Sequence, residues 1–364
     1  MWLFQDFLDQ SKQLNQAPSR SLPAYHPPNK KYKIIHQALT IPNLPAPLHY
    51  LNFLSMIGQP NTPMFRNNSA IRTTPLDTAT VLASSSPHMA GQLNRYSISA
   101  ECSFQEKTFK FANKEQLMGA FPKFQIQRKD TELSFEIEIT TTPLISHFTK
   151  LRFGLAEHWS VLCRCQGEVK YKEQRYDIDQ LGAFEYARSI DFSYLPLAFF
   201  TYQVINLVDQ RQLLLEQIRD SFNRIVQSRI YIRDLQKQQT HMFDRMVCFQ
   251  VHRVYPAVKT PNGQKMYLPR EFEWHYQDEQ GHHIHLYAQS RGDFKFGLAA
   301  GYVGSFKYQL KMDNYEEQGE SGYCEYVDCR ALKWQEKNRK KKIEMKLEKL
   351  FPFHSKNKKK ATFC

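Results

Sequence analysis

Residues 199–235, "FFTYQVINLVDQRQLLLEQIRDSFNRIVQSRIYIRDL", decide between a helical and a β-structured second half of the chain. Their mixture of apolar and polar residues would suit one long amphipathic helix. The segment is, however, rich in β-branched residues, which are restricted in helices: Thr201, Val204, Ile205, Val208, Ile225, Val226 and Ile230. The stretches "VDQR" (208–211) and "DSFN" (220–223) divide it into three pieces of ordinary strand length. The sequence therefore favours three strands, with the helix as the alternative.

Other stretches alternate in the same way. In "FQIQRKDTELSFEIEIT" (124–140) two alternating runs flank a polar turn, which predicts a hairpin. "GSFKYQLKM" (304–312) places aromatic and apolar residues on one face and lysines on the other. Similar patterns occur at 93–104, 158–167 and 266–276. Short alternating strands with frequent turns predict an antiparallel barrel or sandwich.

The chain also contains an internal repeat. Gly-x-x-Glu-Tyr occurs at 182–186 and again at 322–326. Each copy follows a Gly-x-x-Lys-Tyr block, at 167–171 and at 304–308. A repeat period of about 140 residues indicates a duplicated domain rather than a solenoid, whose periods are far shorter.

These features resemble a known group of proteins. An alternating aromatic strand, an acidic turn and "LLLEQIRD" (213–220) resemble the opening of the second half in the carotenoid 1,2-hydratase, tocopherol cyclase-like and AttH-like group. The Gly-x-x-Glu-Tyr segments are similar to the strands that close each barrel there. The resemblance covers about residues 75–330 and is nearest to an uncharacterised bacterial branch. The acidic catalytic cluster of the group has no match in equivalent context, and a basic tail is not a feature of that fold.

The resemblance implies a mainly β chain with two tandem lipocalin-like antiparallel β-barrels. The helix-forming residues after Arg330 predict, in addition, a C-terminal basic helix. We expect an extended, proline-rich arm at 1–30 and a first lipocalin-like barrel at 31–190. A second lipocalin-like barrel is expected at 191–330, followed by a basic helix and disordered tail at 331–364.

The positive charge is concentrated at the end of the chain. The net charge is +13, and residues 333–360 contain twelve Lys or Arg against three Glu, which gives +9 there. An apolar stripe on this basic segment suits attraction to an anionic membrane surface, with Lys340, Lys341, Lys342 and Lys346 as contacts. The alternative is a solvated tail that aids solubility. Nucleic acid is a less favoured partner, because the rest of the chain shows no basic face.

The cysteines, the first residues and the sequence motifs limit which cofactors and which cellular location can be predicted. Seven cysteines without metal-site or disulfide-framework spacing indicate reduced thiols and a cytoplasmic protein, with peripheral attachment at the inner membrane face as a variant. The start "MWLFQDFLDQ" lacks the features of a secretory signal. No nucleotide-binding or hydrolase motif occurs, so no cofactor is predicted. His275, His283 and His285 could share an ion, but histidines beside a turn are usually solvated, and no metal site is predicted.

The repeated Glu-Tyr pairs are the first candidates for chemistry. Neighbouring residues of a strand point to opposite faces, so Glu185 and Tyr186 should diverge, as should Glu325 and Tyr326. A glutamate inside a barrel would be a buried acid with a raised pKa, able to protonate an alkene or epoxide, with the tyrosine as orienting group. A glutamate outside would be a surface ion-pair member. The simpler alternative is a closure motif retained by duplication, whose Gly lets the strand bend and whose Glu or Tyr forms hydrogen bonds across the halves.

The expected function is binding of an apolar small molecule, an isoprenoid- or acyl-type lipid, in a β-barrel cavity. The candidate pocket residues are His158, Trp159, Tyr202 and Trp274. The first alternative is an acid-catalysed hydratase, cyclase or isomerase that acts on an unsaturated lipid through the glutamates. The second is a peripheral membrane scaffold that acts through the basic tail. The sequence leaves open whether turnover occurs and which oligomer forms.

Overall fold

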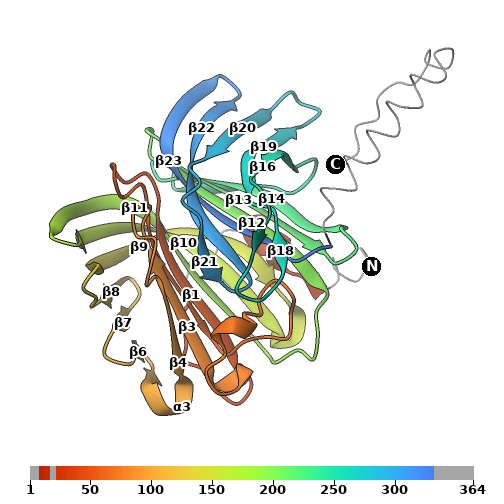
Figure 1. Cartoon of the computed structure of the whole chain (residues 1–364). Coiled ribbons are helices and arrows are strands. Elements are labelled where there is room, and N and C mark those ends of the chain that lie inside the picture. The colour runs from red at the N-terminus through yellow and green to blue at the C-terminus, as the bar shows by residue number, and fades with distance from the viewer. Residues whose placement is uncertain (1–7, 17–21, 332–364) are drawn as a thin grey trace.

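The computed structural model describes residues 8–16 and 22–331, and strands dominate it (Figure 1). Residues 199–235 form no helix. They form the three strands β12 (Leu197–Asn206), β13 (Arg211–Asp220) and β14 (Ile225–Asp234), which pair antiparallel in this order. The two turns fall on the polar stretches that divide the segment. The strand prediction is therefore confirmed and the helical alternative is wrong.

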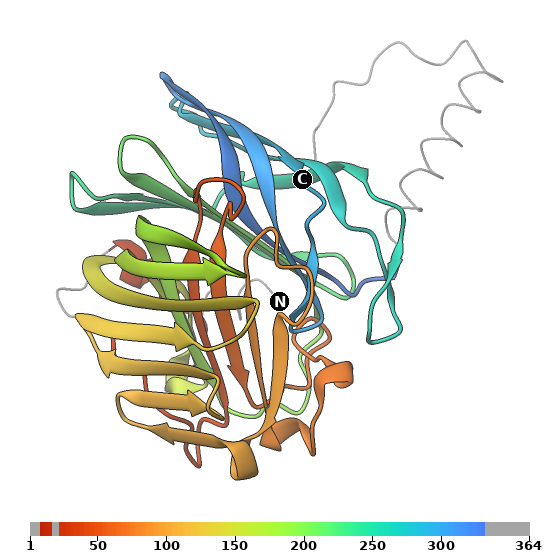
Figure 2. The ribbon, with the colours of Figure 1, turned by 60° about the vertical axis from the view of Figure 1, so that its left-hand side comes forward.

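The first sheet is a nearly closed barrel. Its eleven strands follow the order β4-β3-β2-β1-β11-β10-β9-β8-β7-β6-β5, and the short helix α3 (Ile98–Glu101) joins its two edge strands. Figure 2 shows the long strands of this barrel curling around its interior. The strands are β1 (Ile34–Ile41), β2 (Leu51–Ile57), β3 (Thr78–Ser84), β4 (Leu93–Ser97), β5 (Cys102–Gln105), β6 (Thr108–Phe111), β7 (Glu115–Ala120), β8 (Lys123–Arg128), β9 (Leu133–Lys150), β10 (Ala156–Tyr171) and β11 (Gln174–Ser189).

The second sheet is a half-barrel. Its order is β15-β14-β13-β12-β23-β22-β20-β19-β16, with β21 added beside β22. Its further strands are β15 (Gln239–Phe243), β16 (Cys248–Val254), β19 (Pro269–Gln277), β20 (His283–Ser290), β21 (Lys295–Leu298), β22 (Gly301–Met312) and β23 (Tyr315–Asp328). A separate small hairpin pairs β17 (Val258–Lys259) with β18 (Lys265–Met266). The predicted fold class, mainly β with two lipocalin-like barrels, is confirmed, although the second barrel is open.

The helical elements among the described residues are short. They are α2 (Ser11–Gln16), α3 and the 3-10 turns η1 (Asn68–Ala70), η2 (Pro75–Asp77) and η3 (Arg152–Gly154). No helix in residues 8–16 and 22–331 is long and apolar enough to cross a membrane. The predicted basic helix and its contacts Lys340, Lys341, Lys342 and Lys346 lie outside the described residues. Within the described residues Cys102, Cys163, Cys165, Cys324 and Cys329 are free thiols.

Aromatic rings fill the interiors of both barrels. In the first barrel the ring centroids of Phe124 and Phe184 lie 4.7 Å apart. In the second, those of Phe249 and Trp274 lie 4.9 Å apart. These rings belong to two separate buried cores, one per barrel. Each barrel is therefore stabilised by its own packed interior.

The N-terminal segment packs into the core of the first barrel. Residues 22–33 contain no helix or strand, and the ring of Tyr25 contacts those of Phe121, Phe124 and Phe184, with centroids 5.4–5.9 Å apart. The Tyr25 hydroxyl donates to the carbonyl of Gly119. This tyrosine is buried in the first core, so the segment is part of the barrel's packing.

The outer faces of the two barrels pack against each other and form a third core. The Tyr50 and Tyr323 ring centroids lie 5.2 Å apart across this interface, and those of Phe148 and Tyr231 lie 5.3 Å apart. The interface residues come from β1, β2, β3, β9 and β11 of the first barrel, from β12, β13, β14, β21, β22 and β23 of the second, and from loops that contain Tyr50, Met64 and Ala300. In both barrels the strand that closes the sequence repeat, β11 or β23, lies in this interface.

Helix α2 bridges the two barrels at one edge of the interface. The Asn15 side chain exchanges two hydrogen bonds with the backbone of His147 on β9, at 2.8 and 2.9 Å. The Arg229 guanidinium on β14 donates to the Ser11 hydroxyl at 3.0 Å. Residues 8–16 therefore tie β9 of the first barrel to β14 of the second.

Candidate functional site

The two repeated glutamates face the space between the barrels. On β11, Phe184 and Tyr186 point into the first core, so Glu185 points out of that barrel. On β23, Glu325 likewise points outward, away from the second core. Each glutamate is nevertheless only 5% exposed, because the outer faces cover each other. The sequence offered a buried inward position or a surface position, and the structure gives a third, buried between the barrels.

The partner tyrosines lie on the other faces. Tyr186 belongs to the first core and donates its hydroxyl to the carbonyl of His26 at 3.1 Å. Tyr326 belongs to the second core, where its ring lies 5.5 Å from that of Phe199. The structure therefore separates both tyrosines from the carboxyl groups, as strand alternation predicts, and neither bonds to its neighbouring glutamate.

The Gly-x-x-Glu-Tyr copies are structurally equivalent, and the glycines leave room for core side chains. A Cβ on Gly322 would lie 2.4 Å from the ring of Phe306, and one on Gly182 would lie 2.7 Å from the Cys165 sulfur. Close approach therefore requires glycine, rather than the strand bend suggested by the sequence.

The Gly-x-x-Lys-Tyr blocks are not equivalent. Gly167 pairs with Ile178 near the hairpin end of β11, whereas Gly304 pairs with Cys324, directly before Glu325. The match between these two blocks is therefore one of sequence alone.

Strand register aligns a row of polar side chains on each side of the interface. Residues directly opposite each other on neighbouring strands share a face of the sheet. The row on the first barrel contains Glu185, Ser160 and Ser146, from β11, β10 and β9. The row on the second barrel contains Glu325, Tyr202, Glu216 and Arg229, from β23, β12, β13 and β14. The two rows are the candidate site.

Glu185 is paired with a histidine. The His158 Nε2 atom lies 3.2 Å from Glu185 Oε2. Burial by itself would raise the pKa of Glu185, but the hydrogen bond and charge of His158, with help from Tyr202 and His36, lower it below its ordinary value. The His158 side chain is 23% exposed, so solvent reaches this end of the site. Glu185 is therefore held as a carboxylate.

Glu325 has the opposite character. Burial, reinforced by the charge of Glu185, raises the pKa of Glu325 well above the ordinary value of 4.5. A hydrogen bond that Tyr323 donates at 2.9 Å only moderates this effect. The sensitivity of Glu325 to the Glu185 charge means that the two carboxyls act on each other across the interface. The pKa values of the two carboxyls are therefore displaced in opposite directions, which makes Glu185 the stronger acid and Glu325 the weaker one.

A third carboxyl and a guanidinium complete the site. Burial raises the pKa of Glu216, although His158, Arg229 and a hydrogen bond from Gln227 oppose it. Arg233 is fully buried on β14 and donates to the Ser160 hydroxyl at 3.1 Å. Burial lowers the pKa of Arg233, and Tyr202 and Glu185 are among the groups that oppose this shift. The site therefore concentrates ionisable groups in a region that is otherwise apolar.

Several polar atoms of this site make no hydrogen bond within the described residues. Tyr202 lies close enough to Glu185 to affect its pKa, yet the two do not complete an aligned hydrogen bond. The unpartnered atoms of the site are Glu185 Oε1, Tyr202 OH, Glu216 Oε1, Arg233 Nε and Ser146 Oγ. Buried polar atoms usually have partners, because an unpaired one costs about 1–3 kcal/mol. Both donors and acceptors thus remain free to contact a bound molecule.

The four predicted pocket residues do not line one pocket. His158 and Tyr202 lie in the site between the barrels. Trp159 lies in the first core, and Trp274 lies in the second core with its indole donating to Gln203 at 2.7 Å. The tryptophans therefore contribute to packing in separate barrels.

Sequence reasoning missed several residues of the site. Glu216 is an acid within the apolar run "LLLEQIRD", and this contrast could have singled it out. Tyr323 lies two residues before Glu325 and so shares its face. Nothing in the sequence pattern distinguishes Arg233 from the other arginines of 224–233.

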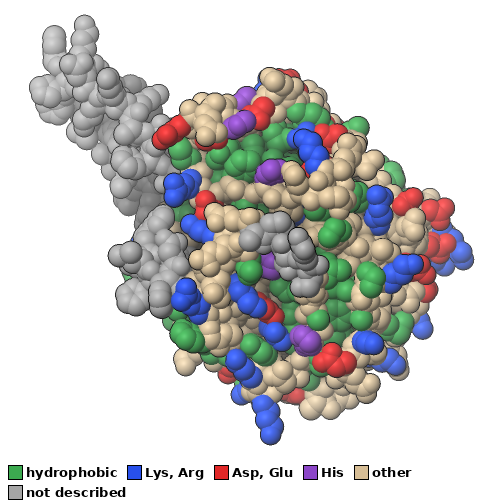
Figure 3. Space-filling view, turned by 180° about the vertical axis from the view of Figure 1, so that it is seen from behind, with side chains coloured by type: hydrophobic (Ala, Val, Ile, Leu, Met, Phe, Trp, Pro, Cys, Tyr) green, Lys and Arg blue, Asp and Glu red, His purple; other side chains and the backbone are tan. Residues whose placement is uncertain are grey.

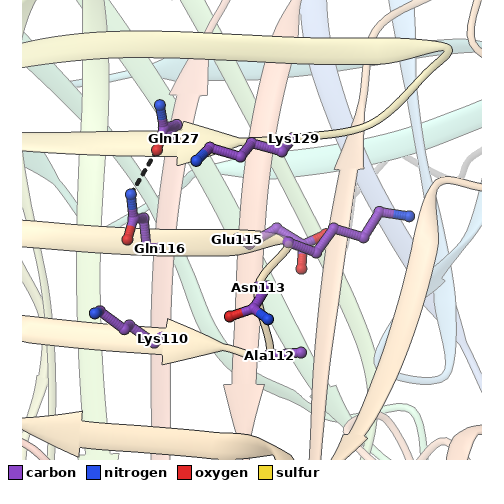
Figure 4. A pocket seen from close by; sticks show the side chains of 8 residues that line it. Lys110, Ala112, Asn113, Glu115, Gln116, Gln127 and Lys129 are labelled. Carbon is purple, nitrogen blue, oxygen red and sulfur yellow. Dashed lines mark hydrogen bonds between the residues drawn. The ribbon is translucent and has the colours of Figure 1, made fainter.

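Other polar features of the described residues are weaker candidates for a functional site. No group of three or more His, Cys, Asp or Glu side chains in residues 8–16 and 22–331 is arranged to hold a metal ion. A pocket of about 220 Å³ lies on the outside of the first barrel, lined by Lys110, Glu115, Gln116 and Lys129 among others (Figure 4). Its buried Glu115 is already bound to Arg128 at 2.9 Å. Figure 3 shows acidic and basic side chains interspersed on the face opposite to that of Figure 1.

Comparison with known families identifies the chain's family. Residues 54–341 match the family described as "Family of unknown function (DUF6670)", and the chain belongs to it. Comparison with curated proteins gives no match.

Solved structures show the same fold at low sequence identity. A candidate AttH protein from Nitrosomonas europaea is 14% identical with a TM-score of 0.60, over 86% of this chain and 99% of that chain. Kievitone hydratase from Nectria haematococca is 11% identical with a TM-score of 0.52, over 81% of this chain and 89% of that chain. The resemblance to the AttH-like group is therefore confirmed at the level of the fold.

Proposed function

We propose that the protein binds an unsaturated, largely apolar small molecule between its barrels and adds water to it, or cyclises it, by acid–base catalysis. One observation carries this proposal: Glu185 and Glu325 are both buried between the barrels, the charge of Glu185 acts on Glu325, and their pKa values are displaced in opposite directions. Such a pair supplies a general acid and a general base at the same pH. Among the similar structures, the hydratase named for kievitone supports a hydratase role for this fold.

The proposed hydration assigns one role to each carboxyl. Protonated Glu325 donates its proton to one alkene carbon while a water attacks the other carbon and loses a proton to Glu185. One C–H and one C–O bond form, and the alkene π bond is lost. The proton on Glu185 then returns to Glu325, and Tyr202, opposite Glu325 and close to Glu185, is placed to pass it. In a cyclisation a second alkene of the same molecule replaces the water: a C–C bond forms in place of the C–O bond, and the resulting carbocation loses a proton to Glu185 to give a new alkene.

The surroundings of the site favour an apolar ligand with a polar group. Phe148, Val204 and Tyr323 belong to the apolar core of the interface, and each buried methylene of a ligand contributes about 0.8 kcal/mol. An isoprenoid- or acyl-type lipid meets this requirement. Kievitone hydratase is, by its name, a hydratase of kievitone, which supports hydration as a reaction that this fold can host.

The test is product formation in deuterium oxide. A panel of unsaturated isoprenoid and acyl compounds is incubated with the protein and examined by mass spectrometry for the gain of one water or for an isomer. We expect deuterium at the protonated carbon, and loss of the product in Glu325→Gln and in Glu185→Gln. Glu173→Gln, in the exposed turn between β10 and β11, is the matched control. Unchanged product formation in Glu325→Gln contradicts the proposed mechanism.

Binding without turnover is the second candidate, favoured by the unpartnered polar atoms of the site. Native mass spectrometry of the purified protein, followed by a denatured lipid extract, detects a retained ligand. A ligand that is lost in Tyr202→Phe but never converted would support this function instead. A protein that carries nothing above background contradicts it.

A further inference from the structure

A chain of buried hydrogen bonds runs from the first barrel to Glu325 on the second. Its members are Tyr50 and Asn52 around β2, Ser84 at the end of β3, and Tyr323 and Glu325 on β23. The first four are fully buried, and Glu325 is 5% exposed. The chain therefore connects the acid of the proposed reaction to residues outside its own barrel.

A backbone N–H group determines which atom is the donor and which is the acceptor in each hydrogen bond of this series. The Ser84 backbone N–H donates to Asn52 Oδ1 at 2.7 Å, and a backbone N–H can only donate. This bond identifies the amide oxygen of Asn52 without ambiguity. The Ser84 hydroxyl also donates to Oδ1, at 2.9 Å, so the Tyr50 hydroxyl, 3.1 Å from it, must be its donor.

The same logic fixes the hydrogen of Tyr323. Because Asn52 Oδ1 faces Ser84, its Nδ2 faces Tyr323 and donates to the hydroxyl oxygen at 3.0 Å. The single hydroxyl hydrogen of Tyr323 then goes to Glu325 Oε1, at 2.9 Å. If Glu325 instead donated to Tyr323, the Tyr323 hydrogen would have no recorded acceptor among the described residues. Glu325 Oε1 is therefore an acceptor.

We propose that Asn52 and Tyr323 are positioning residues that keep the acid proton of Glu325 on Oε2, the oxygen that Tyr323 does not touch. The catalytic meaning of this arrangement rests on the proposed function, but the arrangement itself does not. A protonated carboxyl has one hydroxyl oxygen and one carbonyl oxygen, and the carbonyl oxygen is the better acceptor. With Oε1 occupied as the acceptor, only Oε2 can deliver the proton. The first barrel thus selects which oxygen of the second barrel's glutamate is the acid.

The experiment is infrared difference spectroscopy of the protonated carboxyl, with Glu325→Gln used to assign the Glu325 C=O band. Tyr323→Phe removes the donor to Oε1, so the band should move to higher frequency. Asn52→Asp places an acceptor opposite Tyr323 and turns its hydroxyl away from Glu325, so the same upward shift is expected. The double variant should show no additional shift, since each single change already removes the same hydrogen bond, the one from Tyr323 to Glu325.

Ser84→Ala is the matched control. It removes a hydroxyl of the chain but keeps the backbone N–H that orients Asn52, so the band should stay in place. Thermal unfolding checks that each variant is folded, and Tyr323→Phe alone decides the result if Asn52→Asp is not folded. Three results would overturn the proposal. The Glu325 C=O band could keep its frequency in Tyr323→Phe, it could move equally in Ser84→Ala, or it could be absent from the wild type. Turnover that survives Glu325→Gln would contradict the proposed function and leave these band shifts intact.

Discussion

Replacing Glu325 by Gln is expected to remove a pH-dependent loss of stability. Burial holds the pKa of Glu325 well above 4.5, its ordinary value, so the folded protein keeps a proton that the unfolded chain releases above that pH. The unfolded state then binds fewer protons, and stability falls as pH rises until the carboxyl ionises in the fold. Below pH 4.5 both states are protonated and the contribution of the group is fully present.

The magnitude follows from the linkage relation. One such group lowers the free energy of unfolding by about 1.4 kcal/mol for each pH unit over which it stays protonated in the fold. The pKa of Glu216 is also raised, so the wild type carries a second contribution of the same sign. A domain is typically stable by only about 5–15 kcal/mol, so the slope is measurable. Gln is neutral at every pH and can still accept the hydrogen bond from Tyr323, so Glu325→Gln should have the shallower slope.

The assay is urea unfolding at a series of pH values from about 5 to 8, chosen to lie above the unfolded pKa. The buried Trp159 and Trp274 report by fluorescence on the first and second barrel. Glu173→Gln, in an exposed turn, controls for the loss of one acidic group. If Glu325→Gln keeps the wild-type slope, Glu325 is not held protonated in the fold and its role as the acid fails.

Three further outcomes are expected. Gln203→Leu leaves the indole of the fully buried Trp274 without its acceptor, so urea unfolding should show a loss of about 1–3 kcal/mol; an unchanged midpoint would contradict this. Asp9→Asn removes the carboxylate that lies 3.6 Å from the buried Arg229. Thermal unfolding should show a loss of about 1–2 kcal/mol in the free energy of unfolding. An unchanged transition would mean that this contact does not stabilise the fold. Deletion of residues 333–364 removes a net charge of +9 and should abolish sedimentation with anionic vesicles, while equal sedimentation would rule out the tail as the membrane contact.

The strands and the duplication were predictable because they depend on local pattern. β-branched residues and two polar turns in 199–235 predicted β12, β13 and β14 correctly. The Gly-x-x-Glu-Tyr repeat marked equivalent strands, since Gly182 and Gly322 both make room for a core side chain. The accompanying Gly-x-x-Lys-Tyr match was misleading, because it does not correspond in register.

The site was predictable only in part. The alternating side chains of a strand show which residues share a face of the sheet, but they do not show what packs against that face. This alternation correctly separated Glu185 from Tyr186, but only the packing of one barrel on the other buries the outward face. His158 and Trp159 are both predicted pocket residues, although neighbouring residues of a strand point to opposite faces of the sheet. Glu216 is part of the site through its register with Tyr202, which no local pattern reveals.

Because β11 and β23 both lie in the interface between the barrels, two copies of one glutamate can become an acid and a base. Two identical barrels joined as a symmetric dimer would give their glutamates identical neighbours, so neither could keep the proton in preference to the other. Within one chain each copy can change alone. Trp159 pairs with Tyr186 and Tyr302 pairs with Tyr326, so the position of His158 corresponds to that of Gly301. Glu185 thus has an imidazole beside it, whereas the matching place near Glu325 has no side chain, an asymmetry that two barrels in one chain permit and a symmetric dimer does not.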